Sequence, residues 1–256
     1  MKLLIDAEGL GYRELNSRVR KFLNNNSHDK EVIIKNVLGQ RYIGCSLKGS
    51  VLINIYGTAG NDLGAFMDGS TIEVFSNGQD GIGNTMNSGK IIVHGDAGDI
   101  LGYSMRGGEI YVEKNIGFRG GIHMKSYQEK VPVVVIGGSA GDFLGEYMAG
   151  GIIILLGLYK KQKVNLPFSR NTGIVGNYTG TGMHGGKIYI RGSLEDYKLG
   201  KEVKKAELDK GDLNVLNRYI KNYYNFFNPD KVKVLASSFL KLVPHSHRPY
   251  GKLYAY

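Results

Sequence analysis

The hydrophobic and polar positions of this chain repeat about every 19 residues between residues 44 and 192. Methionine marks one position of the repeat, and Leu47 occupies the same position one repeat earlier. These ladder residues are Leu47, Met67, Met86, Met105, Met124, Met148 and Met183. Glycine lies three positions before each of them, at Gly44, Gly64, Gly83, Gly102, Gly121, Gly145 and Gly180. A fixed period of this length indicates a solenoid, in which each repeat packs only against its neighbours.

Each repeat also contains a short stretch in which apolar and polar residues alternate. After Met105, for example, Ile110 and Val112 are apolar and lie five and seven positions along. Side chains alternate between the two faces of a strand, so such pairs point to one side. One strand cannot bury that side alone, and stacking equivalent strands in parallel would bury it.

We therefore expect an all-β protein, a single-stranded right-handed parallel β-helix of about seven coils. The ladder residues would fill its core. The glycines would form its corners, because tight turns need backbone conformations that a Cβ atom disfavours.

The flanking segments predict short helical caps at both ends. Apolar residues recur at three- and four-residue spacing within residues 12 to 24 and again within residues 212 to 227. Residues 2 to 5 and 239 to 243 are candidates for short strands. The expected domains are an N-terminal cap over residues 1–43, the β-helix over 44–192 and a basic C-terminal cap over 193–256. Insertions interrupt the repeats at 126–130 and 158–172.

The outward positions of the predicted strands are mixed, but all of them except Glu73 form an apolar strip. In the repeats that keep the same distance from ladder methionine to strand, these positions are Glu73, Ile92, Tyr111, Ile154 and Tyr189. An exposed apolar strip on a soluble protein usually marks a contact. This pattern predicts that another subunit or layer covers the strip.

The net charge of +10 comes from segments outside the repeats. Residues 198 to 256 contain 12 basic and 5 acidic residues, residues 159 to 170 contain 4 basic residues, and the rest of the chain has 17 basic and 18 acidic residues. A nucleic-acid surface needs basic and aromatic residues on one regular face, which the repeats lack. We expect no nucleic-acid partner. The chain has no apolar run long enough to span a membrane, so a cytoplasmic location without membrane contact is expected.

Several motifs imitate functional sites. The segments 95–99 and 138–142 resemble phosphate-binding loops, but another strand follows each of them instead of a helix. The aspartates among them are expected to cap turns. His245 and His247 are the closest pair among the six histidines, and we can name no third ligand for a metal. The single cysteine, Cys45, is expected to pack in the first coil and is too few for a cysteine-ligated cluster. We expect this chain to hold no catalytic, cofactor-binding or metal-binding residue.

The ordered repeats resemble a known family. The segments GTAGNDLGAFMDGSTIEVF, GNTMNSGKIIVHGDAGD, GYSMRGGEIYV, GDFLGEYMAGGIIILLG and GTGMHGGKIYIRG are similar to the GXGXG domain at the C-terminus of the glutamate synthase large subunit. The flanks IDAEGLGYRELN, NVLGQRY and LVPHSHRPYGKLY are similar to those of the version that occurs as a separate chain.

The resemblance implies a complex that makes glutamate from glutamine and 2-oxoglutarate. Its expected partners are a glutaminase (amidotransferase) subunit and a synthase subunit, and the FMN and iron–sulfur clusters would lie in the partner subunits. This chain would be a non-catalytic spacer that holds those parts in register. Two alternatives remain: the β-helix subunit of a formylmethanofuran dehydrogenase-like complex, and a free-standing ligand-binding β-helix.

Overall fold

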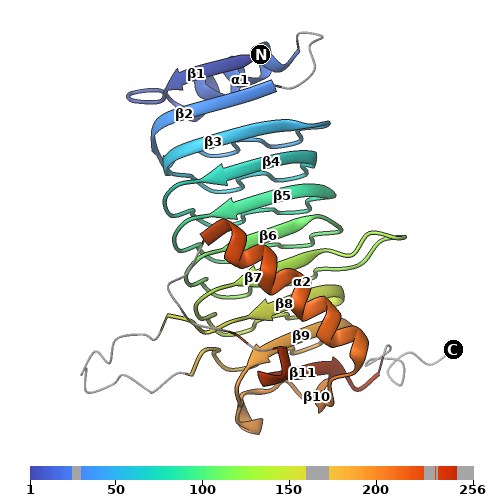
Figure 1. Cartoon of the computed structure of the whole chain (residues 1–256). Coiled ribbons are helices and arrows are strands. Elements are labelled where there is room, and N and C mark those ends of the chain that lie inside the picture. The colour runs from blue at the N-terminus through green and yellow to red at the C-terminus, as the bar shows by residue number, and fades with distance from the viewer. Residues whose placement is uncertain (25–29, 160–172, 228–233, 235, 247–256) are drawn as a thin grey trace, which may run out of the picture.

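The protein folds as a parallel β-solenoid in which one sheet runs the length of the molecule (Figure 1). The computed structural model describes residues 1–24, 30–159, 173–227, 234 and 236–246. In the described part, eleven strands form a sheet of order β1-β2-β3-β4-β5-β6-β7-β8-β9-β11-β10. The β-helix class is confirmed, with about six turns in place of the expected seven.

The first nine strands pair in parallel and in chain order. They are β1 (Lys2–Asp6), β2 (Lys30–Leu38), β3 (Val51–Thr58), β4 (Asp68–Val74), β5 (Ser88–Val93), β6 (Glu109–Val112), β7 (Val133–Ile136), β8 (Ala149–Leu155) and β9 (Gly185–Arg191). The remaining elements are the strands β10 (Val203–Ala206) and β11 (Phe239–Pro244), the helices α1 (Tyr12–Leu23) and α2 (Lys210–Phe227), and the 3₁₀ helices η1 (Asp196–Lys198) and η2 (Ala236–Ser238).

The predicted inward pairs form two continuous columns in the core. Ile91 pairs in register with Ile110, and Ile110 pairs with Val134 in spite of the five-residue insertion between them. The insertion is accommodated in the loop, where Tyr127 and Lys130 form an isolated antiparallel bridge. The register is kept because a shift by one residue would turn every apolar side chain outward.

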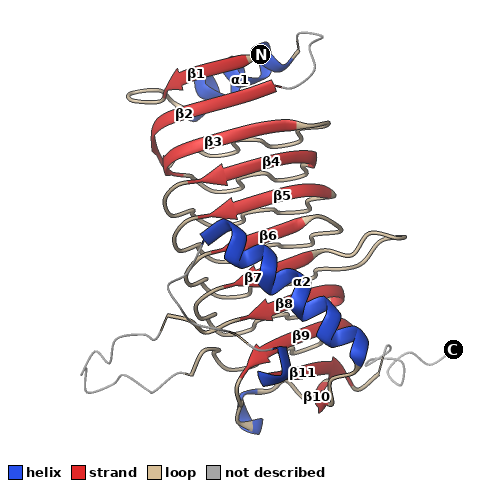
Figure 2. Ribbon diagram, in the orientation of Figure 1, coloured by secondary structure: helices blue, strands red, loops and turns tan. Residues whose placement is uncertain are grey.

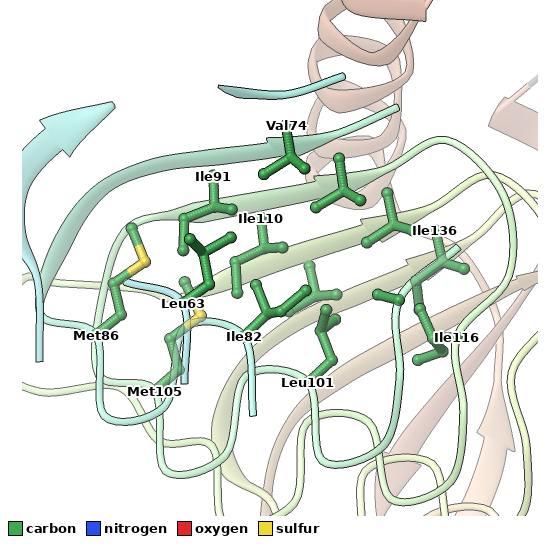
Figure 3. Packing of buried hydrophobic residues seen from close by; sticks show 14 of the residues in the cluster. Leu63, Val74, Ile82, Met86, Ile91, Leu101, Met105, Ile110, Ile116 and Ile136 are labelled. Carbon is green, nitrogen blue, oxygen red and sulfur yellow. The ribbon is translucent and has the colours of Figure 1, made fainter. Parts of the chain in front are cut away.

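A third side of the core was not anticipated from the sequence. Leu63, Ile82, Leu101 and Leu144 are buried and lie between the ladder glycines and the preceding turn. Figure 3 shows Leu63, Ile82 and Leu101 facing the isoleucines of the strands across the interior. Single apolar residues in glycine-rich turns have no period-two signal, so the pattern of the strands could not reveal them.

The two ends of the solenoid are covered differently. At the N-terminal end α1 buries Leu15 and Val19 against the core, as a cap should. The second predicted helix, α2, is present but lies along the outer face of the sheet (Figure 2). At the C-terminal end of the solenoid, β11 pairs antiparallel with β9, and β10 pairs antiparallel with β11. Only a strand can supply the backbone hydrogen bonds that an open sheet edge needs.

None of the described helices has the length and apolar character needed to cross a membrane.

Candidate functional site

The glycine corners have an unusual backbone. In each of seven successive repeats, three alternate residues have positive φ, and the ladder glycine is always the middle one. The trios are 42/44/46, 62/64/66, 81/83/85, 100/102/104, 119/121/123, 143/145/147 and 178/180/182. The outer positions are glycine only at Gly81 and Gly182. Left-handed backbone costs a residue with a Cβ roughly 1–2 kcal/mol, so something must offset this strain.

Hydrogen bonds between coils provide that offset. In the coil of Gly102, the N–H groups of Ile100 and Ser104 donate to the carbonyls of Phe118 and Ile122 in the next coil, and that of Gly102 donates to Ile82 in the previous one. Alternate N–H groups therefore point in opposite directions along the solenoid. These backbone hydrogen bonds at the corner join the coil to both neighbouring coils.

The ladder residues lie inside this corner. The six methionines from Met67 to Met183 have no exposed surface, whereas Leu47 in the first coil is only partly buried. A Cβ atom on Gly83 would lie 2.4 Å from Cδ1 of Ile110, and the other ladder glycines except Gly102 face a neighbouring side chain at 2.4 to 2.6 Å in the same way. Glycine is thus favoured at these corners by conformation and, at all of them except Gly102, required by space.

The phosphate-loop imitations have no room for an anion. A Cβ atom on Gly98 would lie 2.1 Å from Oδ1 of Asp80, because that carboxylate occupies the corner of the next coil. The same oxygen accepts the backbone N–H of Asp99 at 2.8 Å, and Asp99 in turn accepts the N–H of Phe118 at 2.8 Å. These aspartates cap backbone groups between coils, as the turn interpretation predicts.

The described histidines make local contacts and do not converge on a metal. His94 lies 2.7 Å from a carboxylate oxygen of Glu73 and stacks on Phe75, and His123 stacks on Tyr147. His28 and His247 lie outside the described residues. In the part of the chain that the structure describes, no three His, Cys, Asp or Glu side chains form a group that could hold a metal.

The apolar outward strip is covered by the chain's own helix α2. Tyr111, Ile154 and Tyr189 are fully buried in a second hydrophobic cluster, together with the α2 residues Leu216, Tyr219, Ile220 and Tyr223 (Figure 1). The layer that the strip predicted is therefore intramolecular at these positions. Tyr223 also donates from its hydroxyl to the carbonyl of Glu113 at 2.6 Å.

A buried ionic group holds the start of α2 on the sheet. The carboxylate of Asp212 is inaccessible to solvent and accepts from Tyr189 Oη at 2.6 Å and from Lys187 Nζ at 2.7 Å. It also pairs with the ammonium of Lys241 and accepts the N–H of Asp209. Burial alone would raise the pKa of Asp212, but these donors hold it well below its usual range.

The outer face beyond α2 stays open. Over β1 to β4 it exposes Leu4 (61%), Leu52 (37%), Tyr56 (43%) and Phe75 (40%), and it contains a hollow of about 1030 Å³. Tyr56 stacks on Phe75, and the row of rings continues through His94 to Phe227 at the end of α2. The described chain leaves this part of the outer face uncovered.

Comparison with known proteins identifies the family of this solenoid. The GXGXG motif family matches residues 13–247. The chain belongs to the GXGXG motif family. This is the family of the C-terminal domain of the glutamate synthase large subunit. An uncharacterized protein of Methanocaldococcus jannaschii is 46% identical over 258 residues, which cover 99% of this chain and 96% of the relative.

Family membership accounts for the repeats of this GXGXG chain, while the position of its cysteine differs from the expectation. Cys45, the single cysteine, is only half-buried and borders a surface hollow, so its expected place inside the first coil is wrong.

Proposed function

We propose that this GXGXG chain is the non-catalytic structural subunit of a glutamate synthase complex, which makes glutamate from glutamine and 2-oxoglutarate. The match to the GXGXG family over residues 13–247 is the observation that carries the proposal. In this role the solenoid holds a glutaminase subunit and an FMN- and iron–sulfur-containing synthase subunit in register. Register matters because ammonia released at one site has to reach the other without escaping to solvent.

The construction of the solenoid supports a spacer role. Each corner from that of Gly64 to that of Gly145 is hydrogen-bonded to the coils on both sides, and one hydrophobic core runs from Ile5 near the N-terminus to Leu242 in β11. Repeat proteins of this kind derive stability from every interface between neighbours. A rod built in this way resists bending and presents its faces at fixed distances.

The cofactors are assigned to the partner subunits. An iron–sulfur cluster needs several cysteine thiolates, and Cys45 is the only cysteine of this chain. The donor set therefore does not fit a cluster here. FMN and the clusters would supply electron transfer in the synthase subunit, and the contribution of this chain would be position.

The test is co-purification from the native host. The chain is tagged at its genomic locus and purified at low salt, and the eluate is analysed by mass spectrometry and assayed for glutamate formation from glutamine and 2-oxoglutarate. We expect a glutaminase chain and a flavin- and iron–sulfur-containing synthase chain in constant ratio to the tagged chain, together with activity.

A strain that carries the tag on an unrelated cytosolic protein is the control. Recovery of the chain alone, or with subunits of a molybdenum or tungsten enzyme, would contradict the glutamate synthase assignment. Recovery with subunits of a molybdenum or tungsten enzyme would favour the formylmethanofuran dehydrogenase-like alternative.

A further inference from the structure

Two adjoining hollows lie between α1 and the first coil at the N-terminal end of the solenoid. Their volumes are about 760 and 570 Å³, and both are bordered by Arg20, Asn24 and Cys45. The wall from α1 includes one helical face, formed by Arg13, Asn16, Ser17, Arg20 and Lys21, together with Tyr12, Leu23 and the C-cap residue Asn24. The opposite wall is the segment from Cys45 to Val51. We call this continuous depression the α1 groove.

The α1 groove is strongly basic. Its described lining includes Arg13, Arg20, Lys21, Lys30 and Lys48 and contains no Asp or Glu. Neither Arg20 nor Lys48 forms an ion pair or side-chain hydrogen bond with another described residue. Asp68 pairs with Lys48 across a parallel bridge, and the charge of Lys48 acts on its carboxyl group. The groove still carries an excess of positive charge, which attracts an anionic ligand.

The backbone adds a donor to these cations. In each later coil, the N–H of the residue after the ladder position donates to the preceding coil, as Asp68 donates to Leu47 at 2.7 Å and Asn87 to Met67 at 2.8 Å. Lys48 holds this position in the first coil, where no coil precedes it. No described residue accepts its N–H, and Ser46 and Ser50 line the same hollow as Lys48.

The geometry points to an acidic, extended peptide segment of a partner protein as the ligand of the α1 groove. Arg13 and Arg20 are seven residues apart on α1, which corresponds to about 10 Å along the helix. Two carboxylates spaced along a chain can pair with both guanidinium groups without either side chain bending toward a common point. An extended chain rises about 3.3 Å per residue, so carboxylates two to four residues apart would reach successive cations.

Stacked nucleic-acid bases would find no free ring in this groove. The ring of Tyr12 has the guanidinium of Arg41 at 4.9 Å and packs against Tyr42 at 5.8 Å, and Arg41 also lies over Tyr42. The hydrogen bond from Arg13 and the charges of Arg13 and Arg41 lower the pKa of Tyr12, in keeping with a positive local potential. Carboxylates suit these ammonium, guanidinium, hydroxyl and N–H donors without any need for stacking.

The test measures binding of fluorescein-labelled hexaglutamate to the purified full-length chain by fluorescence anisotropy. The groove variant is Arg20→Glu/Lys48→Glu. The matched control is Lys125→Glu/Lys204→Glu, which changes the net charge equally, and Lys125 occupies the same repeat position as Lys48 in a central coil. We expect the groove variant to lose about tenfold in affinity at low salt and the control to stay within about twofold.

Equal losses in the two variants, or no binding by the wild type, would overturn the assignment. Tighter binding of an oligothymidylate of similar charge, with the same dependence on Arg20 and Lys48, would also overturn it and would favour a nucleic acid as the ligand. Displacement of the peptide by low millimolar inorganic phosphate would overturn it as well. Thermal unfolding midpoints check folding, and Arg20→Gln/Lys48→Gln replaces the groove variant if charge reversal prevents folding. Because the assay needs no partner enzyme, its outcome is independent of the glutamate synthase proposal.

Discussion

At the scale of single residues, this protein depends on backbone positions that most side chains avoid. Twelve of the fourteen outer corner positions have positive φ without being glycine, including the β-branched Ile100 and Thr85. Their strain is tolerated because the same conformation directs alternate N–H groups toward both neighbouring coils. The middle position differs, since a Cβ there would usually also strike the core.

Comparison of two glycines should separate strain from steric clash. Gly83 has φ of 69° and would place a Cβ 2.4 Å from Ile110, whereas Gly192 has φ of 91° and nothing within 4 Å. We expect Gly192→Ala to cost about 1 kcal/mol from strain alone and Gly83→Ala to cost at least about 2 kcal/mol more. Thermal and urea unfolding of both variants measure this, and equal losses would contradict the clash.

At the scale of elements, helix α2 completes the sheet. It covers the outward apolar residues of β6 to β9, and its first turn is attached by Asp212 to Lys187 on β9 and Lys241 on β11. Burial raises the pKa of Tyr189, and its hydrogen bond to Asp212 raises it further, so this hydroxyl remains a donor at neutral pH. One carboxylate thus connects three elements that lie far apart in the sequence.

Removal of this charge should weaken the docking of α2 in a pH-dependent manner. Asp212→Asn removes the carboxylate that pairs with Lys187 and Lys241, although Lys241 keeps Asp209 at 3.6 Å, and should cost about 2–3 kcal/mol at pH 7. The pKa of Asp212 is lowered in the folded protein from its ordinary value of 3.8, so the ionised group stabilises the fold above pH 3.8. That contribution is lost as the pH falls through the lower folded value.

The difference between wild type and Asp212→Asn in thermal midpoint should therefore be largest near neutral pH and shrink below about pH 4. Asp196→Asn is the control, because the Asp196 side chain is 86% exposed and pairs only with Lys205 at the surface. A difference that stays constant from pH 7 to pH 3 would show that the charge of Asp212 does not hold the helix.

At the scale of the whole molecule, each coil is a template for the next. The sheet joins strands from β1 to β10, while α1 covers one end and the antiparallel pair of β11 and β10 continues the other. A defect in a central coil removes two interfaces, whereas a defect in the first coil removes one. Position in the stack should therefore determine the effect of a substitution.

Two equivalent charge substitutions should show this dependence. Met105→Asp places a carboxylate in the fully buried centre of the ladder, and we expect the protein to unfold or aggregate. Leu47→Asp changes the same position in the first coil, where the side chain is only partly buried, and should lower the thermal midpoint while leaving a folded protein. Equal thermal midpoints for the two variants would contradict the dependence of stability on position in the stack. Met105→Leu is the control for loss of the thioether.

The repeat could be derived from the sequence because it depends on local periodicity, whereas the family was indicated by the resemblance of the repeat and flanking segments to known ones. The positions of Met86 and Gly83 recur with one spacing, and the strand pairs such as Ile91 and Val93 alternate with polar residues. The pattern within each repeat is kept on both sides of the inserted loops, because each repeat has to pack only against its neighbours. The outer apolar strip could also be recognised, although not what covers it.

The position of α2 and the basic character of the α1 groove were decided by the tertiary structure. The summed charge outside the C-terminal segment and the insertion is near zero, yet Arg20, Lys30 and Lys48 face one groove while Glu14 and Glu31 pair with Arg18 and Lys2 elsewhere. Composition counts charges without their directions. Periodicity determined what each coil must be, whereas packing between distant segments determined which faces were covered and which charges came together, because those contacts have no spacing along the chain.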